Sequence, residues 1–247
     1  LQVRPGTVHA LLGENGAGKS TLMKLLLGIY HPDQGTILFK GETLKNHSPQ
    51  QALDKGISMI HQELSPVLDM RVCDNIFLGR EPVKYGLVDD KRLFRDTEEL
   101  LQSLGMTDLD PLAKMCDLSV AQTQMVEIAK AVSYKADLII MDEPTSTISE
   151  AEVQILFSII RDLRGRGISV IYISHKMSEI FEITDEITVF RDGAYIATGK
   201  TCDMTQEELV TMMVARNLSQ YYVKTPHEIG ESVLAVEGMC LPGRLYD

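Results

Sequence analysis

The chain has 247 residues, of which 44% are hydrophobic and 24% charged, and its net charge is −11. This composition is that of an ordinary globular protein, and the acidic balance disfavours nucleic acid as the partner of the whole chain. No apolar run approaches the roughly 18 residues of a membrane-spanning helix. The four cysteines are far apart and form no C-x-x-C pair, so neither a zinc site nor a disulfide framework is indicated.

Short apolar runs alternate along the chain with longer stretches of helical periodicity. Strands are expected over residues 7–13, 35–40, 57–61, 137–142, 168–174, 186–192 and 194–199. Helices are expected after Lys19, Pro49, Asp89, Ser119, Ser149, Lys176 and Thr205. Two of these helices open with a capping box, formed by Ser149 with Glu152 and by Thr205 with Glu208. The alternation predicts an α/β fold, with a mainly parallel sheet covered by helices on both faces.

One region interrupts the alternation. Between about residues 63 and 136 we expect several helices and no convincing strand, which indicates a helical subdomain inserted between two strands of the sheet. Residues 226–231 are polar and rich in turn formers, so we expect a linker there. We therefore assign residues 1–225 to one domain and residues 232–247 to the beginning of another.

The stretch GENGAGKST, residues 13–21, matches the phosphate-binding pattern G-x-x-x-x-G-K-[ST] and lies between a predicted strand and a predicted helix. Glycines allow the backbone N–H groups to surround a phosphate chain, and the helix start adds its positive end. Lys19 would reach the β- and γ-phosphates, and the Ser20 hydroxyl would bind Mg²⁺. The predicted nucleotide-binding residues here are Gly13, Glu14, Asn15, Gly16, Ala17, Gly18, Lys19, Ser20 and Thr21.

Two carboxylates follow the apolar run LIIM at residues 138–141. Asp142 and Glu143 then stand at the carboxyl end of a buried strand, where open α/β sheets bind their ligands. We expect Asp142 to hold Mg²⁺ and Glu143 to polarise an attacking water molecule. Surface acids at the end of a strand are common, so this assignment depends on the upstream phosphate-binding loop.

Two further polar residues end predicted strands, Gln62 in HQE and His175 in YISHK. The segment Leu118–Gln122, LSVAQ, begins an amphipathic helix between them. Each feature is weak alone, because a polar residue at a strand end usually faces solvent. The N-K-x-D tetrapeptide expected of a GTPase does not occur in the sequence.

The order of these features resembles the ATPase domain of ABC transporters over nearly the whole chain. The resemblance implies a P-loop NTPase fold of the ABC ATPase type, with the helical subdomain between the glutamine loop and the signature. It implies that Gln62 senses Mg²⁺ and the γ-phosphate, that His175 contacts the γ-phosphate, and that Asp142 and Glu143 are the metal-binding and catalytic carboxylates. ATP and Mg²⁺ are the implied substrate and cofactor.

Leu118–Gln122, hereafter the signature segment, is similar to the family's L-S-G-G-Q but has Val120 and Ala121 in place of the glycines. Ser119 and Gln122 remain, and the resemblance implies that they bind the γ-phosphate of a nucleotide held by an opposite ATPase domain. A plain capped helix is the alternative. A second departure is STIS at residues 146–149, where the family tends to show S-A-L-[DT].

Several longer stretches, among them GISMIHQEL, QMVEIAKA and MDEPTS, resemble the first half of tandem sugar-import ATPases. These serve ribose, galactose, xylose or arabinose, and the greatest similarity is to galactose/methyl-galactoside importers. The resemblance implies a second ATPase domain in the same polypeptide and a membrane permease as partners. An extracytoplasmic sugar-binding protein would act indirectly, and the ATPase would lie on the cytoplasmic face of the membrane. We expect the chain to be a fragment that lacks its first strands, including the adenine-stacking aromatic residue.

Other classes share the nucleotide-binding residues. DNA-repair and chromosome-maintenance ATPases insert long arms or zinc modules, and the short interval between Gln62 and Leu118 leaves no room for a long coiled-coil arm. A translation factor would carry basic stretches, and a binding-only regulatory domain would not need Glu143 and His175. An importer of another solute, such as nucleosides, also remains open.

Overall fold

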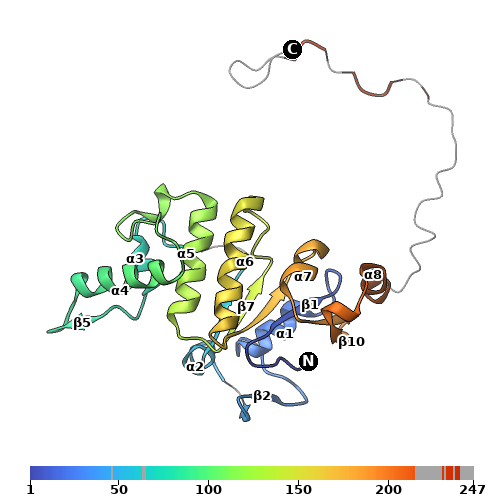
Figure 1. The fold of residues 1–247 in the computed structure, drawn as a ribbon, viewed down its shortest axis with the longest axis horizontal. Coiled ribbons are helices and arrows are strands. Elements are labelled where there is room, and N and C mark those ends of the chain that lie inside the picture. Colours follow the sequence, from blue (N-terminus) through green and yellow to red (C-terminus); the bar gives the residue numbers. More distant parts are fainter. Residues whose placement is uncertain (46, 63–64, 215–229, 231, 236, 240–247) are drawn as a thin grey trace. The chain divides into compact units, whose positions relative to one another are not determined.

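A six-stranded sheet forms the centre of the fold in the computed structural model, which describes residues 1–45, 47–62, 65–214, 230, 232–235 and 237–239 (Figure 1). Its strand order is β10-β9-β1-β8-β7-β4. All neighbours pair in parallel except β10, which is antiparallel to β9. The strands are β1 (Val8–Leu12), β4 (Ile57–Ile60), β7 (Leu138–Asp142), β8 (Ser169–Ile173), β9 (Glu186–Arg191) and β10 (Ala194–Lys200).

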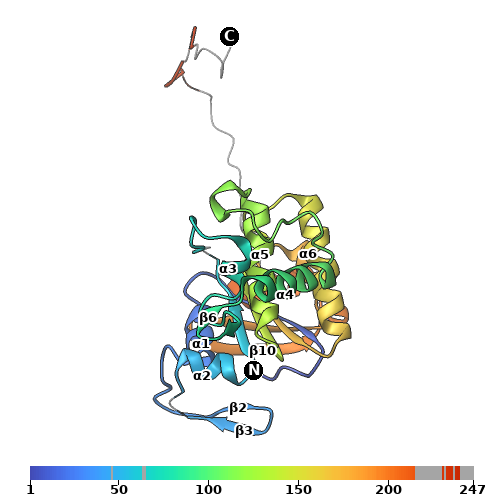
Figure 2. The same ribbon diagram turned by 90° about the vertical axis from the view of Figure 1, so that its left-hand side faces the viewer.

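The sheet buries both of its faces. Alternate residues of the apolar strands point to opposite sides, so Ile140 and Ile171 join one apolar cluster while Ile139 and Val170 join the other. The first cluster is covered by α1 (Lys19–Leu26) and α2 (Pro49–Asp54). The second is covered by α5 (Val120–Ser133), α6 (Glu150–Gly165) and α7 (Met177–Ile183), of which α5 and α6 lie side by side (Figures 1 and 2). The predicted α/β layering is therefore confirmed.

The smaller elements add detail that periodicity does not predict. A separate hairpin of β2 (Ile37–Phe39) and β3 (Glu42–Leu44) stands away from the main sheet (Figure 2). The strands and helices expected from the sequence are all present, and the last helix is α8 (Gln206–Val214). Both capping boxes are confirmed, since the N–H of Ser149 and that of Thr205 each donate to the expected glutamate.

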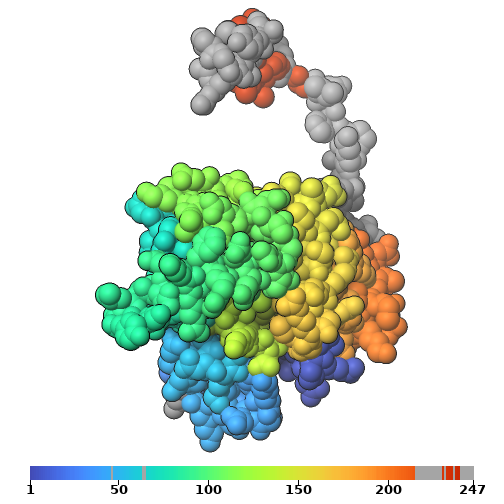
Figure 3. Space-filling model, turned by 60° about the vertical axis from the view of Figure 1, so that its left-hand side comes forward, coloured from blue at the N-terminus to red at the C-terminus, as the bar shows by residue number. Residues whose placement is uncertain are grey.

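The insertion between β4 and β7 is mainly helical, as predicted, and contains α3 (Val72–Ile76), α4 (Asp90–Ser103) and α5. The expectation that it contains no strand is wrong. A two-residue hairpin, β5 (Val83–Lys84) with β6 (Leu87–Val88), protrudes from its surface (Figure 3). Its pairs are too short to produce an alternating pattern, and its apolar side chains face solvent, with Tyr85 95% exposed.

A backbone ladder joins two segments of the insertion, residues 68–73 and 111–116. Met115 and Cys116 N–H groups donate to the carbonyls of residues 70 and 68, at 3.0 Å each, and two further bonds run in the opposite direction. The first segment leads away from Gln62, and the second leads into the signature segment. The ladder therefore joins the segment that follows Gln62 to the segment that precedes Ser119.

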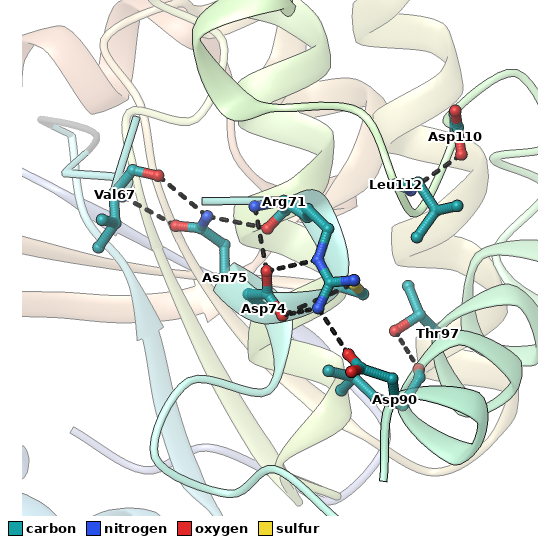
Figure 4. Close-up of polar contacts among 10 residues, drawn as sticks. Val67, Arg71, Asp74, Asn75, Asp90, Thr97, Asp110 and Leu112 are labelled. Carbon is teal, nitrogen blue, oxygen red and sulfur yellow. Dashed lines mark hydrogen bonds and ion pairs between the residues drawn. The ribbon is translucent and has the colours of Figure 1, made fainter. Parts of the chain in front are cut away.

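Asn75 fixes the entry to this ladder (Figure 4). Its side chain is 1% exposed, accepts from the N–H of Val67 at 2.8 Å, and donates to the carbonyls of Val67 and Arg71 at 3.1 Å each. Arg71 in turn bonds both oxygens of Asp74, at 2.7 and 2.8 Å, and reaches Asp90 at 2.8 Å. This arginine keeps the pKa of Asp74 below its ordinary value.

The chain separates into two units, Leu1–Ala215 and Arg216–Asp247. The predicted linker at 226–231 and the predicted start of a second domain at 232–247 fall mostly outside the described residues, so that division stays a prediction. Among the residues that the structure describes, no helix is both long enough and apolar enough to cross a membrane.

Replacing Asn75 by Ala should lower the free energy of unfolding by about 2–3 kcal/mol, because three hydrogen bonds made by a buried side chain to Val67 and Arg71 are lost. Urea denaturation measures this difference. Gln102→Ala, an exposed position on α4, is the matched control and should change stability by less than about 0.5 kcal/mol. Equal stability of the two variants would show that Asn75 does not hold the loop.

Candidate functional site

Four parallel strands, β1, β8, β7 and β4, deliver polar residues to one edge of the sheet. Their carboxyl ends lead to residues 13–18, His175, Asp142 and Gln62, respectively. These ends surround a cavity of about 310 Å³. Its lining consists of Asn15, Gly16, Ala17, Gly18, Lys19, Ser20, Thr21, Gln62, Asp142, Glu143 and His175. The structure thus brings together the residues predicted for phosphate, metal and water, except Gly13 and Glu14, which do not line the cavity.

The phosphate-binding loop needs its glycines for two different reasons. A Cβ on Gly13 would lie 2.4 Å from the carbonyl oxygen of Phe190 and 2.8 Å from Ala17 Cβ, so no larger residue fits there. Gly18 adopts a left-handed conformation with φ of 94° and precedes α1 without any side-chain cap. The first N–H groups of α1 are therefore free of a side-chain partner and offer a binding site for an anion.

Lys19 places a positive charge over this loop. Its ammonium donates to the carbonyls of Gly13 at 2.6 Å and Glu14 at 3.1 Å. Burial lowers the pKa of Lys19, and the nearby carboxylates of Asp142 and Glu143 oppose that shift. The site thus pairs one cation with two anions, and a bound phosphate would bring its own negative charge to this lysine.

Asp142 is the carboxylate best suited to a divalent ion. Burial first, and then the negative charge of Glu143, raise its pKa, while Lys19 opposes the shift. A desolvated carboxylate gains strongly from a cation, and Ser20 lines the same cavity. The described residues contain no cluster of three or more His, Cys, Asp or Glu side chains able to hold a metal. The set fits Mg²⁺, which takes one or two protein oxygens and completes its shell with phosphates and water.

Glu143 lies between two of the predicted site residues. Gln62 Nε2 donates to one of its carboxylate oxygens at 3.0 Å, and His175 Nε2 lies 2.7 Å from the other. The backbone of Glu143 is left-handed, with φ of 48°, and its N–H donates to the carbonyl of Ile173 at 2.9 Å. Such conformations cost about 1–3 kcal/mol and cluster at functional sites. Glu143 is therefore held, at some strain, where its carboxylate faces the cavity.

Ser119 and Gln122 do not line this cavity. They form a capping box at the start of α5, in which the N–H of Ser119 donates to Gln122 at 2.9 Å and the Ser119 hydroxyl accepts from the N–H of Gln122 at 3.2 Å. Ser119 is exposed, and Val120 beside it is 56% exposed. The signature segment thus offers an open helix start to solvent, and its role toward another nucleotide stays a prediction.

A buried set of polar groups behind Glu143 and His175 was not predicted. Glu179, on α7, accepts hydroxyl hydrogen bonds from Thr145, Tyr172 and Ser174 at 2.8–2.9 Å. The signal available in the sequence is Tyr172 within the apolar strand VIYI, because a buried tyrosine hydroxyl needs a partner. Its partner could not be identified, since Glu179 follows on a different element.

Comparison with known proteins gives a family for this pattern. The sequence model of the ABC transporter family matches residues 1–146. A Geobacillus kaustophilus protein, provisionally named as a ribose/galactose/methyl galactoside import ATP-binding protein, is 58% identical over 100% of this chain and 49% of its own length. The galactose/methyl galactoside import ATP-binding protein MglA of Escherichia coli is 51% identical over 97% of this chain and 47% of its own. The chain spans about half the length of these relatives.

Solved structures share the fold. A crystal structure of the ADP conformation of an ATP-binding cassette of an ABC transporter is 26% identical, with a TM-score of 0.70 and 85% of both chains covered. A nucleotide-free ATP-binding cassette of an ABC transporter is 25% identical, with a TM-score of 0.71 and 87% of both chains covered. These similarities confirm the predicted fold class, a mainly parallel sheet with an inserted helical part.

Replacing Asp142 by Asn should stabilise the protein without nucleotide at neutral pH. The raised pKa means that the folded state binds the proton more tightly than the unfolded chain does, so ionised Asp142 destabilises the fold. Thermal unfolding should show a higher midpoint for Asp142→Asn at pH 7, and the gain should shrink as the pH falls through the raised pKa. Asp33→Asn, at an exposed position, should show no such gain. A lower midpoint for Asp142→Asn at pH 7 would contradict the assignment.

Proposed function

This chain belongs to the ABC transporter family, and we propose that it is an ATP-hydrolysing domain that energises import of a monosaccharide through a membrane permease. The relatives named for ribose, galactose and methyl galactoside import support the sugar, and their greater length supports a second ATPase domain in the same polypeptide. Galactose and methyl galactoside are the first candidates, with ribose, xylose and arabinose as alternatives.

The observation that carries the proposal is the shared cavity of Lys19, Asp142 and the Glu143–His175 pair. Phosphoryl transfer needs a positively charged phosphate site, a metal-binding oxygen and a group that orients water. The loop at residues 13–21 would hold the phosphates, and Ser20, Asp142 and Gln62 would hold Mg²⁺. Bound Mg²⁺ would supply positive charge that neutralises the phosphate oxygens during transfer.

Glu143 is the base in the proposed reaction. Its carboxylate accepts a proton as the water oxygen forms a bond to the γ-phosphorus and the bond to the bridging oxygen of ADP breaks. Lys19 and His175 stabilise the charge that develops on the phosphoryl oxygens. Gln62, which bonds Glu143, links this carboxylate to the loop that enters the helical insertion.

The exposed signature segment completes a nucleotide site of another ATPase domain in this proposal. The capping box bonds the N–H of Gln122, so the N–H groups of Val120 and Ala121 at this helix start would bind the anion, and Ser119 would add its hydroxyl. Two such domains would meet head to tail, each covering the nucleotide of the other. The residues that depart from the family pattern, at 120, 121 and 147–149, lie in segments that would face this partner.

The helical insertion is the proposed contact with the permease, which would hold the ATPase as a peripheral subunit on the cytoplasmic face of the membrane. The β5–β6 hairpin supports this assignment, because Val83, Tyr85 and Leu87 are 64%, 95% and 76% exposed. An apolar group of this kind on a surface marks an interaction site. A binding protein outside the membrane would deliver the sugar to the permease.

Replacing Glu143 by Gln in the full-length protein should reduce steady-state ATP hydrolysis by about 10²–10⁴-fold, because an amide cannot accept the proton of water. Magnesium-ATP binding should remain, so the variant should trap bound ATP. Glu150→Gln, at an exposed position seven residues later, is the control and should hydrolyse ATP normally. Normal turnover by Glu143→Gln would remove Glu143 from this role.

The transport function is tested by assembling the full-length protein with its permease and extracytoplasmic binding protein in vesicles. ATP hydrolysis is then measured with galactose, methyl galactoside, ribose, xylose or arabinose present. We expect at least one of these sugars to stimulate hydrolysis, and the one that does so at the lowest concentration identifies the cargo. Stimulation by a nucleoside and by none of the sugars would refute sugar import.

A further inference from the structure

Glu179 is a buried carboxylate that none of the proposed chemical steps uses. It lies on α7 and is 5% exposed. One oxygen, Oε2, accepts from the hydroxyls of Thr145 at 2.9 Å, Tyr172 at 2.8 Å and Ser174 at 2.9 Å. The other oxygen pairs with the Lys176 ammonium at 3.1 Å. A carboxylate is buried at this cost only where it is fully bonded.

The donors come from the two segments that carry Glu143 and His175. Thr145 stands two residues after Glu143, at the exit from β7, and Ser174 directly precedes His175 at the exit from β8. Lys176, on the other side of His175, also donates to the carbonyl of Thr145 at 3.2 Å. A single carboxylate therefore bonds both segments directly behind the contact of 2.7 Å between Glu143 and His175.

We propose that Glu179 is a positioning residue that holds the Glu143 and His175 segments together and so orients the base that accepts the proton of water. The inference deepens the proposed function and rests on it. Glu179 does not touch the cavity itself, since it is absent from the residues that line it. Its effect would pass through Thr145 and Ser174, each bonded to it and each within two residues of a cavity residue.

The protonation state of Glu179 agrees with this role. Burial alone would raise its pKa, but the hydrogen bonds from Tyr172, Thr145, Lys176 and Ser174 outweigh it, so the pKa of Glu179 lies below its ordinary value. The same burial and the same carboxylate raise the pKa of the Tyr172 hydroxyl. The group is thus a carboxylate that only accepts hydrogen bonds, whereas a glutamine would direct an NH₂ group at Lys176 or at the hydroxyls.

The test is single-turnover hydrolysis of bound ATP by the full-length protein assembled with its permease. This rate counts only molecules that hold nucleotide, so a loss of folded protein does not change it. Glu179→Gln should slow this rate by about 10–100-fold while the dissociation constant for magnesium-ATP changes by less than about threefold. Thr145→Val, which removes the bond between the Glu143 segment and Glu179 together with a longer contact to Lys176, should also slow it by about tenfold.

Glu182→Gln is the matched control on the same helix, since Glu182 is 41% exposed and, among the residues that the structure describes, pairs with Arg161 alone. Its rate should equal that of the unchanged protein. In addition, the ring ¹⁵N shifts of His175 should move in Glu179→Gln and stay in place in Glu182→Gln. Thr145→Val decides the question if Glu179→Gln does not fold.

Rates within about fivefold of the unchanged protein for both Glu179→Gln and Thr145→Val would overturn the inference, even if both variants melt at lower temperature. Glu143→Gln is measured in parallel to separate this failure from that of the proposed function. If Glu143→Gln stops hydrolysis and Glu179→Gln does not slow it, only the inference about Glu179 fails. Normal hydrolysis by Glu143→Gln would refute both.

Discussion

Parallel pairing of β1, β8 and β7 is the constraint on which the candidate site depends. In this register Asp142 lies opposite Ile173, so the chain leaves β7 and β8 at the same level. Glu143 and Ser174 follow directly, which brings His175 into contact with Glu143. The loop after β1 leaves the same edge and bends back toward β9, where Gly13 allows the close approach of the Phe190 carbonyl. Residues that are more than 150 positions apart in the sequence thus meet because three strands run in the same direction.

The sheet that sets this geometry is mostly apolar on both faces, and Tyr172 on β8 is one of the buried side chains that carry a polar group. Tyr172 is fully buried in β8 and stacks edge-on against Phe157 while its hydroxyl bonds Glu179. Aromatic packing and a polar contact are therefore combined in one side chain. The apolar layer stabilises the strands, and the buried polar groups above it fix the two segments that carry Glu143 and His175. The residues that stabilise the sheet and those that position the site are therefore direct neighbours in the sequence.

The sequence predicts the parts of this molecule that have a local cause. Strand and helix periods, the capping boxes and the loop at residues 13–21 depend on neighbours in the chain, and all are confirmed. The contacts of Glu179 could not be predicted, because its donors lie on other elements and only the strand register brings them together. The β5–β6 hairpin was missed for a different reason. Two residue pairs are too few to give a period, and their apolar side chains point to solvent.

The backbone ladder between residues 68–73 and 111–116 has a mechanical consequence. Its four N–H···O=C bonds resist shear, and Asn75 adds three more at the end nearer Gln62. The second segment leads directly into Ser119 and α5, so we expect a displacement of residues 68–73 to move the start of α5 as well. The position of Ser119, which we propose to face the nucleotide of another domain, is thus tied by main-chain hydrogen bonds to the segment that Asn75 holds.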